Sequence, residues 1–68
     1  MNPEIIQIAE KLAAQRLVVQ NMGMMNAPSD VKERIEFDAL YMLAVSKLRH
    51  LNTQYEAALS KYYGEDHE

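Results

Sequence analysis

The sequence predicts an all-α fold, an antiparallel helical hairpin with a short helix at about residues 3–22 and a long helix at about residues 30–63. Three observations predict it. Apolar residues recur at steps of three and four in two segments, as amphipathic helices require. The two prolines precede or open these segments, and the two glycines follow them. We expect two such hairpins to dimerise into a four-helix bundle.

The short helix has a clear start. Asn2 is a good N-cap, Pro3 suits the first helical position, and Glu4 complements the positive end of the helix dipole. Gly23 is the expected stop, because glycine readily adopts the left-handed conformation after a last turn. The apolar face is formed by Ile5, Ile8, Ala9, Leu12, Val19 and Met22.

The long helix follows a short connector. Asp30 with Glu33 fits a capping box, and Ser29 is the rival cap. No glycine or proline then occurs before Gly64. The stretch 49–53 is the weakest part, and a break there would give three helices instead of two. We favour the unbroken helix because the stretch lacks both helix-breaking residues.

Two apolar stripes run along the long helix. The first keeps a heptad spacing without a fault, and it comprises Phe37, Tyr41, Ala44, Leu48, Leu51, Tyr55, Ala58 and Tyr62. The second is shorter, and it comprises Val31, Ile35, Met42 and Val45. A single neighbouring helix cannot cover both stripes, and we expect the short helix not to reach the second half of the long one. A homodimer or higher oligomer is therefore expected.

Composition and charge exclude several functional classes. Ten acidic and seven basic residues give a net charge of −3, and three of the acids lie in the last four residues. A neutral body without a basic patch argues against nucleic acid and against an anionic membrane surface. No apolar run approaches the length of a membrane span, and no signal-like start is visible, so we expect a cytoplasmic protein. Residues 1–63 are expected to form one domain, and 64–68 an acidic flexible tail.

The sequence offers no catalytic, cofactor or metal site. Cysteine is absent, which excludes disulfide scaffolds and cysteine-ligated metals. Ser46 and His50 share a helix face, but no orienting acid or oxyanion hole accompanies them. No HExxH or ExxH motif occurs. The tail 65–68 could hold a metal loosely, although a solvated acidic tail is the simpler interpretation.

Two charges interrupt the apolar stripes. Arg16 projects from the apolar face of the short helix, and Asp38 interrupts the second stripe of the long one. A hairpin that turns near residue 26 places Arg16 opposite residues 36–38. Because a half-buried charge needs a partner, we predict a structural ion pair between Arg16 and Asp38. The alternative is a binding anchor for a target.

The predicted interaction surface combines the aromatic stripe with two methionines. It comprises Phe37, Tyr41, Leu48, Leu51, Tyr55, Tyr62, Met24 and Met25. Tyrosine is enriched at interfaces, and methionine adapts to different partners. The stripe serves either as the homodimer seam or as a groove for another protein. The methionines either cover the end of the bundle or form an adaptable corner.

These features predict a small non-enzymatic protein–protein interaction module, an adaptor, inhibitor or regulator that acts as a homodimeric helical bundle. Very short chains without catalytic residues are common among such proteins in bacteria and phages. The target protein is not identified by the residues. The alternative is a structural or assembly subunit of a larger complex, such as a phage assembly.

Overall fold

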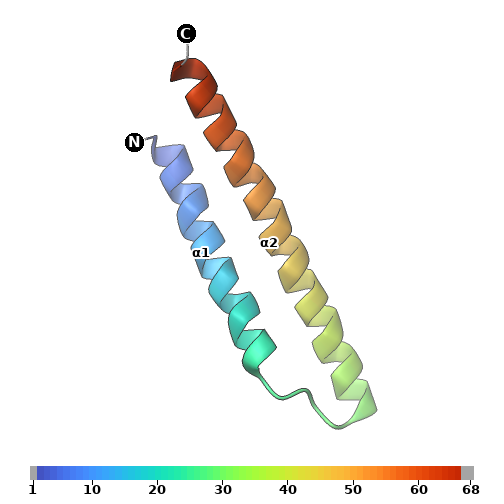
Figure 1. The fold of residues 1–68 in the computed structure, drawn as a ribbon. Coiled ribbons are helices and arrows are strands. Elements are labelled where there is room, and N and C mark those ends of the chain that lie inside the picture. The colour runs from blue at the N-terminus through green and yellow to red at the C-terminus, as the bar shows by residue number, and fades with distance from the viewer. Residues whose placement is uncertain (1, 67–68) are drawn as a thin grey trace.

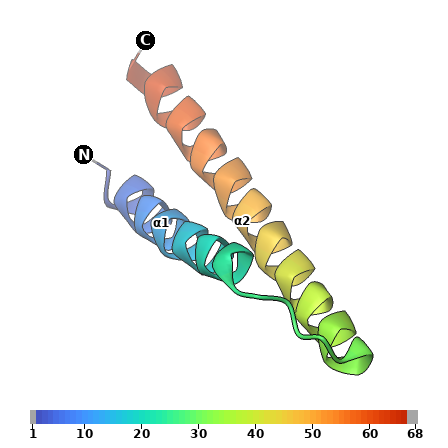
Figure 2. The same cartoon turned by 60° about the horizontal axis from the view of Figure 1, so that its bottom comes forward.

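The chain forms two antiparallel helices that lie side by side (Figures 1 and 2). The computed structural model describes residues 2–66. Helix α1 spans Pro3–Met24 and helix α2 spans Val31–Asp66, with a connector between them. The predicted all-helical hairpin is therefore confirmed. The molecule is a rod of 57 × 14 × 13 Å.

Both helix starts are capped by side chains. The Oδ1 atom of Asn2 accepts a hydrogen bond of 2.8 Å from the backbone N–H of Glu4. The Oδ2 atom of Asp30 accepts one of 3.1 Å from the N–H of Glu33. The carbonyl of Asp30 also accepts from the N–H of Arg34 at 2.9 Å. Asp30, not Ser29, is thus the cap of α2, because it satisfies donors that the first turn leaves free.

The end of α1 differs from the expectation at Gly23. The helix continues through Gly23 to Met24, and neither glycine has a positive φ among the described residues. Met25 closes the helix in an extended conformation, and its N–H donates to the carbonyl of Met22 at 3.3 Å. Gly23 instead lies against the second helix, since a Cβ there would sit 3.4 Å from Oη of Tyr41.

Helix α2 is continuous from Val31 to Asp66, so the three-helix alternative is wrong. Within the weak stretch, the hydroxyl of Thr53 donates to the carbonyl of Arg49 at 3.0 Å. The helix also passes through Gly64 and ends at Asp66, beyond the predicted end at about residue 63. The tail prediction for 67–68 lies outside the described residues.

The register between the helices differs from the expected one. Asn2 and Ile5 lie against Ala58 and Tyr62, so α1 does reach the second half of α2 and that expectation is wrong. The connector explains the difference. The connector continues from the end of α1 with an extended backbone at Met25. Helix α2 therefore begins well beyond the end of α1 (Figure 1). A turn centred near residue 26 would have placed the end of α1 and the start of α2 at the same level.

The interior lies along the line where the helices meet. The buried apolar side chains among the described residues are Ile5, Leu12 and Leu51, at 3%, 6% and 8% exposure. The first stripe of α2 faces this interior, because every one of its eight members is buried or half-buried: Phe37, Tyr41, Ala44, Leu48, Leu51, Tyr55, Ala58 and Tyr62. This heptad-spaced face of α2 packs on α1, whereas the sequence predicted a homodimer seam or a groove for another protein.

One polar side chain also lies in this interior. Gln15 is 8% exposed, and its Nε2 donates a hydrogen bond of 2.9 Å to the carbonyl oxygen of Ala44. This bond joins the middle of α1 to the middle of α2. It links the two helices at this level and satisfies the amide, which would otherwise be buried without a hydrogen-bond partner.

Candidate interaction surface

The chain exposes more surface to solvent than a compact monomer of the same mass. Its accessible area is 5628 Å², whereas a compact monomer of this mass exposes about 4,400 Å². The radius of gyration is 16.2 Å, against about 11 Å for a compact chain of this length. Much of the extra surface is apolar, and its large exposed side chains are Ile6, Leu17, Val18, Met24, Met25, Val31, Ile35, Leu40, Met42, Leu43 and Tyr63.

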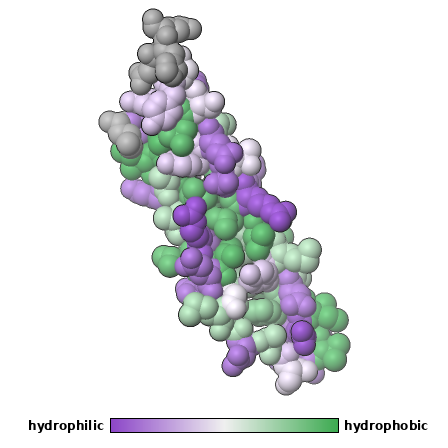
Figure 3. Space-filling model, in the orientation of Figure 1, coloured by the Kyte–Doolittle hydropathy of each residue, from purple (hydrophilic) through white to green (hydrophobic). Residues whose placement is uncertain are grey.

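The exposed apolar side chains concentrate near the connector. Seven of the eleven fall between Met24 and Leu43, although this segment is less than a third of the chain. They include the two predicted methionines, at 83% for Met24 and 60% for Met25. Figure 3 shows apolar surface where α2 begins, and more of it along the molecule between hydrophilic bands. This end is the most apolar exposed part of the described chain.

The aromatic stripe occupies a different position from the predicted free surface. Leu51 is buried, and Tyr55 and Tyr62 are half-buried against α1. The rings of Phe37 and Tyr41 stack with their centroids 6.5 Å apart. The stripe thus packs largely inside the hairpin, because α1 extends further along α2 than expected and covers it. Only the outer edges of these side chains are exposed to solvent.

The predicted half-burial of Arg16 and Asp38 is wrong for the single chain, since both residues are exposed. The register explains their separation. Gln15, the neighbour of Arg16, is bonded to Ala44, and Asp38 lies six residues earlier on α2, about 9 Å along the helix axis. The structure therefore does not bring the two charges to one level.

An apolar groove lies along one side of the hairpin, near the start of α1. Its volume is about 440 Å³, and it is lined by Ile5, Ile6, Ala9, Glu10, Ala13, Tyr55, Leu59 and Tyr63. At its α2 edge, the rings of Tyr62 and Tyr63 meet edge to face, with centroids 5.4 Å apart. The small side chains Ala9 and Ala13 leave room for another helix to approach closely.

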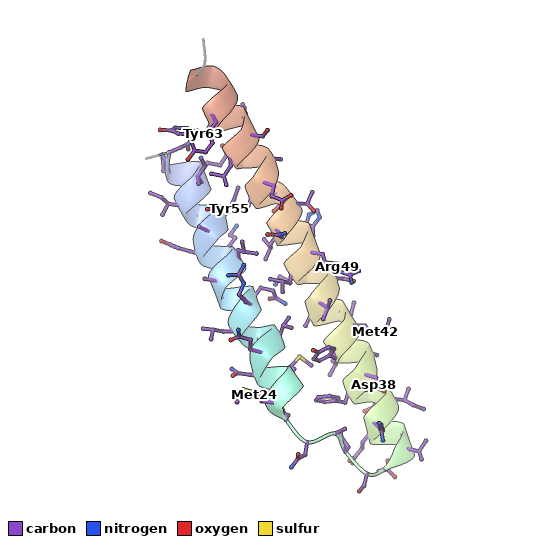
Figure 4. All side chains as sticks on the ribbon, in the orientation of Figure 1. Met24, Asp38, Met42, Arg49, Tyr55 and Tyr63 are labelled. Carbon is purple, nitrogen blue, oxygen red and sulfur yellow. The ribbon has the colours of Figure 1, made fainter. Side chains whose placement is uncertain are left out.

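The groove continues into a second heptad seam on α2. Residues at steps of four and three form this seam, which comprises Val31, Ile35, Asp38, Met42, Val45, Arg49, Asn52, Glu56, Leu59 and Tyr63. Figure 4 shows Asp38, Met42 and Arg49 in succession along one edge of α2. Apart from Asp38, the seam is apolar toward both ends and polar in the middle. Sequence reasoning ended it at Val45 because it followed apolar residues alone.

The structure also locates the sequence's other candidate residues. No group of three or more potential metal ligands gathers in that part of the chain. His50 lies 3.2 Å from the amide nitrogen of Gln54, which engages one ring nitrogen. The acidic tail, with its loose metal-binding alternative, falls largely outside the described side chains.

Comparison with known proteins finds no relative. No protein-family model, no curated protein and no solved structure matches the chain. Within the residues described, neither helix carries a stretch that is long and apolar enough to cross a membrane.

Proposed function

We propose that this chain is a small non-enzymatic protein–protein interaction module, an adaptor, inhibitor or regulator that acts as a homodimeric helical bundle in the cytoplasm. The observation that supports the proposal is the exposed apolar surface of a chain with little interior. Of the residues that the structure describes, three apolar side chains are buried, whereas eleven large ones are exposed. Such a ratio is typical of chains that complete their core with a partner.

The area available is sufficient for a stable dimer. The exposed surface exceeds that of a compact monomer by about 1,200 Å². A standard interface buries about 800 Å² per partner. A second copy can therefore cover one side of the rod and still leave apolar surface at the connector end.

The connector end is the surface that we assign to the protein target. Met24 and Met25 are flexible and apolar, and Val31 is 73% exposed at the first turn of α2. Methionine side chains adapt to the shape of a partner. The aromatic residues of this end, Phe37 and Tyr41, are half-buried and stack on each other, so we expect the target to contribute the large aromatic anchors of the interface.

A second candidate is an assembly subunit of a larger complex. Ile35 and Leu40 are both exposed, yet they project from α2 about 140° apart. One partner helix cannot cover both directions. Open-ended association through several surfaces would follow, and this outcome favours a subunit over a regulator.

Light scattering across a concentration series separates these possibilities. A constant mass of twice the chain's 7.8 kDa supports the dimeric module. A mass that keeps rising with concentration supports the assembly subunit. A fully helical monomer at every concentration would contradict both. The target surface is tested by capture with the wild type and with Met24→Ser/Val31→Ser, and Val18→Ser on α1 is the control.

A further inference from the structure

We propose that a second copy of this chain docks on the side formed by the groove and the second seam, with the two α2 helices antiparallel. In this arrangement Arg49 of each copy pairs with Glu56 of the other. The inference rests on the proposed homodimer and specifies its face and orientation. It starts from the order of residues along the second seam.

The seam is self-complementary when it is reversed. Arg49 and Glu56 flank Asn52, and beyond them lie apolar residues on both sides, Met42 before and Tyr63 after. In an antiparallel pair centred near Asn52, Arg49 of one copy lies within a turn of the level of Glu56 of the other. Met42 then lies within a turn of the level of Tyr63. A parallel pair would instead place Arg49 beside Arg49, which is repulsive.

Arg49 and Glu56 do not pair with each other within one chain. Arg49 and Glu56 are both exposed, and they stand seven residues apart on one helix, about 10 Å along the axis, which is too far for an ion pair. Glu10 lines the groove and adds a second acid near the level of Glu56. The docking side carries a base at Arg49 and acids at Glu10 and Glu56, and an antiparallel copy brings each Arg49 near Glu56 of the other copy.

The α1 helix fits the same docking. Ile6 and Ala13 line the groove on the same side as Tyr63, and they are seven residues apart, so they project in nearly the same direction. In the antiparallel pair, Ile6 of one copy comes near the small Ala13 of the other. The exposed Ile6, Met42 and Tyr63, at 41%, 70% and 55% exposure, become covered.

Charge reversal tests the arrangement. Arg49→Glu alone and Glu56→Arg alone each place like charges opposite each other twice in a homodimer. We expect the dissociation constant of each to rise about tenfold or more at low salt. An equimolar mixture of the two variants restores all pairs across the interface, so it forms a heterodimer of near wild-type affinity. The double variant Arg49→Glu/Glu56→Arg also dimerises again.

Lys47→Glu is the matched control, because it makes the same charge change on the opposite side, where Lys47 lines a different surface hollow. Its dissociation constant stays at the wild-type value. If a single variant loses helicity by circular dichroism, its recovery in the mixture still reports the pairing. Wild-type dissociation constants for both single variants, or no recovery in the mixture, would overturn this docking. Failure of the homodimer itself is distinct, since the wild type would then remain monomeric.

Discussion

The amide of Gln15 holds α1 and α2 in register by donating to the carbonyl oxygen of Ala44 at 2.9 Å. This carbonyl also lies inside a helix, where the backbone N–H four residues later is its regular partner. Gln15 therefore adds a second bond to an oxygen that has two lone pairs. It is the longest-range hydrogen bond described in the chain, spanning 29 residues.

Gln15→Ala should lower the free energy of unfolding by about 0.5–1.5 kcal/mol, the usual net value of one intramolecular hydrogen bond. Ala44 keeps its helical bond, so no buried acceptor is orphaned. Urea denaturation followed by circular dichroism measures the change. Gln20→Ala, at an exposed position of the same helix, is the control. Equal effects from the two variants would show that the bond adds nothing.

Gly23→Ala should stabilise the hairpin by about 0.5–1 kcal/mol. Gly23 lies inside α1 without a positive φ, and alanine has the higher helix propensity. The new Cβ would meet the hydroxyl of Tyr41 at 3.4 Å, which is an ordinary contact. Thermal melting at fixed protein concentration is the measurement. Gly23→Leu should destabilise instead, because a larger side chain must displace Tyr41; a stabilising leucine would argue against this contact.

Asp30→Ala should destabilise the protein by about 1 kcal/mol, because the N–H of Glu33 loses its acceptor. Ser29→Ala should leave the melting temperature nearly unchanged. The two variants differ by one position and together identify the cap of α2. A larger loss for Ser29→Ala would assign the cap to the serine.

Leu51→Ala should be the most damaging of these changes, at about 2–5 kcal/mol, since it opens a cavity at a side chain that is 8% exposed. Leu43→Ala is the matched control, because this leucine is 67% exposed in the same helix. We expect Leu43→Ala to change the unfolding free energy by less than about 0.5 kcal/mol. Similar losses for both variants would show that Leu43 is covered in solution.

The sequence predicted the local features of the fold well. Asn2 and Asp30 were recognisable as caps because capping depends on residues only two or three positions away. The heptad spacing from Phe37 to Tyr62 indicated a packed face of α2, because periodicity reports burial, but it did not indicate that α1 is the helix that covers this face. Continuity through 49–53 followed from the absence of glycine and proline.

The relative placement of the two helices could not be predicted in the same way. It depends on the path of a short connector and on one long-range bond from Gln15, and neither has a periodic signal. For this reason the hairpin does not bring Arg16 and Asp38 to one level. The candidate surface changed with it, since the expected overhang of Tyr55 and Tyr62 is covered by α1, and the apolar excess lies near Met24 and Val31 instead.

The small interior has a consequence for the lifetime of the chain in a cell. Each ordered residue costs about 1–2 kcal/mol of backbone entropy, and three buried apolar side chains offset only a small part of that total. If association with a second copy supplies the remainder, dilution acts as a denaturant and the melting temperature rises with concentration. At concentrations above the dissociation constant of the dimer the chain persists. At lower concentrations it unfolds and becomes a substrate for proteases. The abundance of such a protein then responds to its rate of synthesis more steeply than in simple proportion.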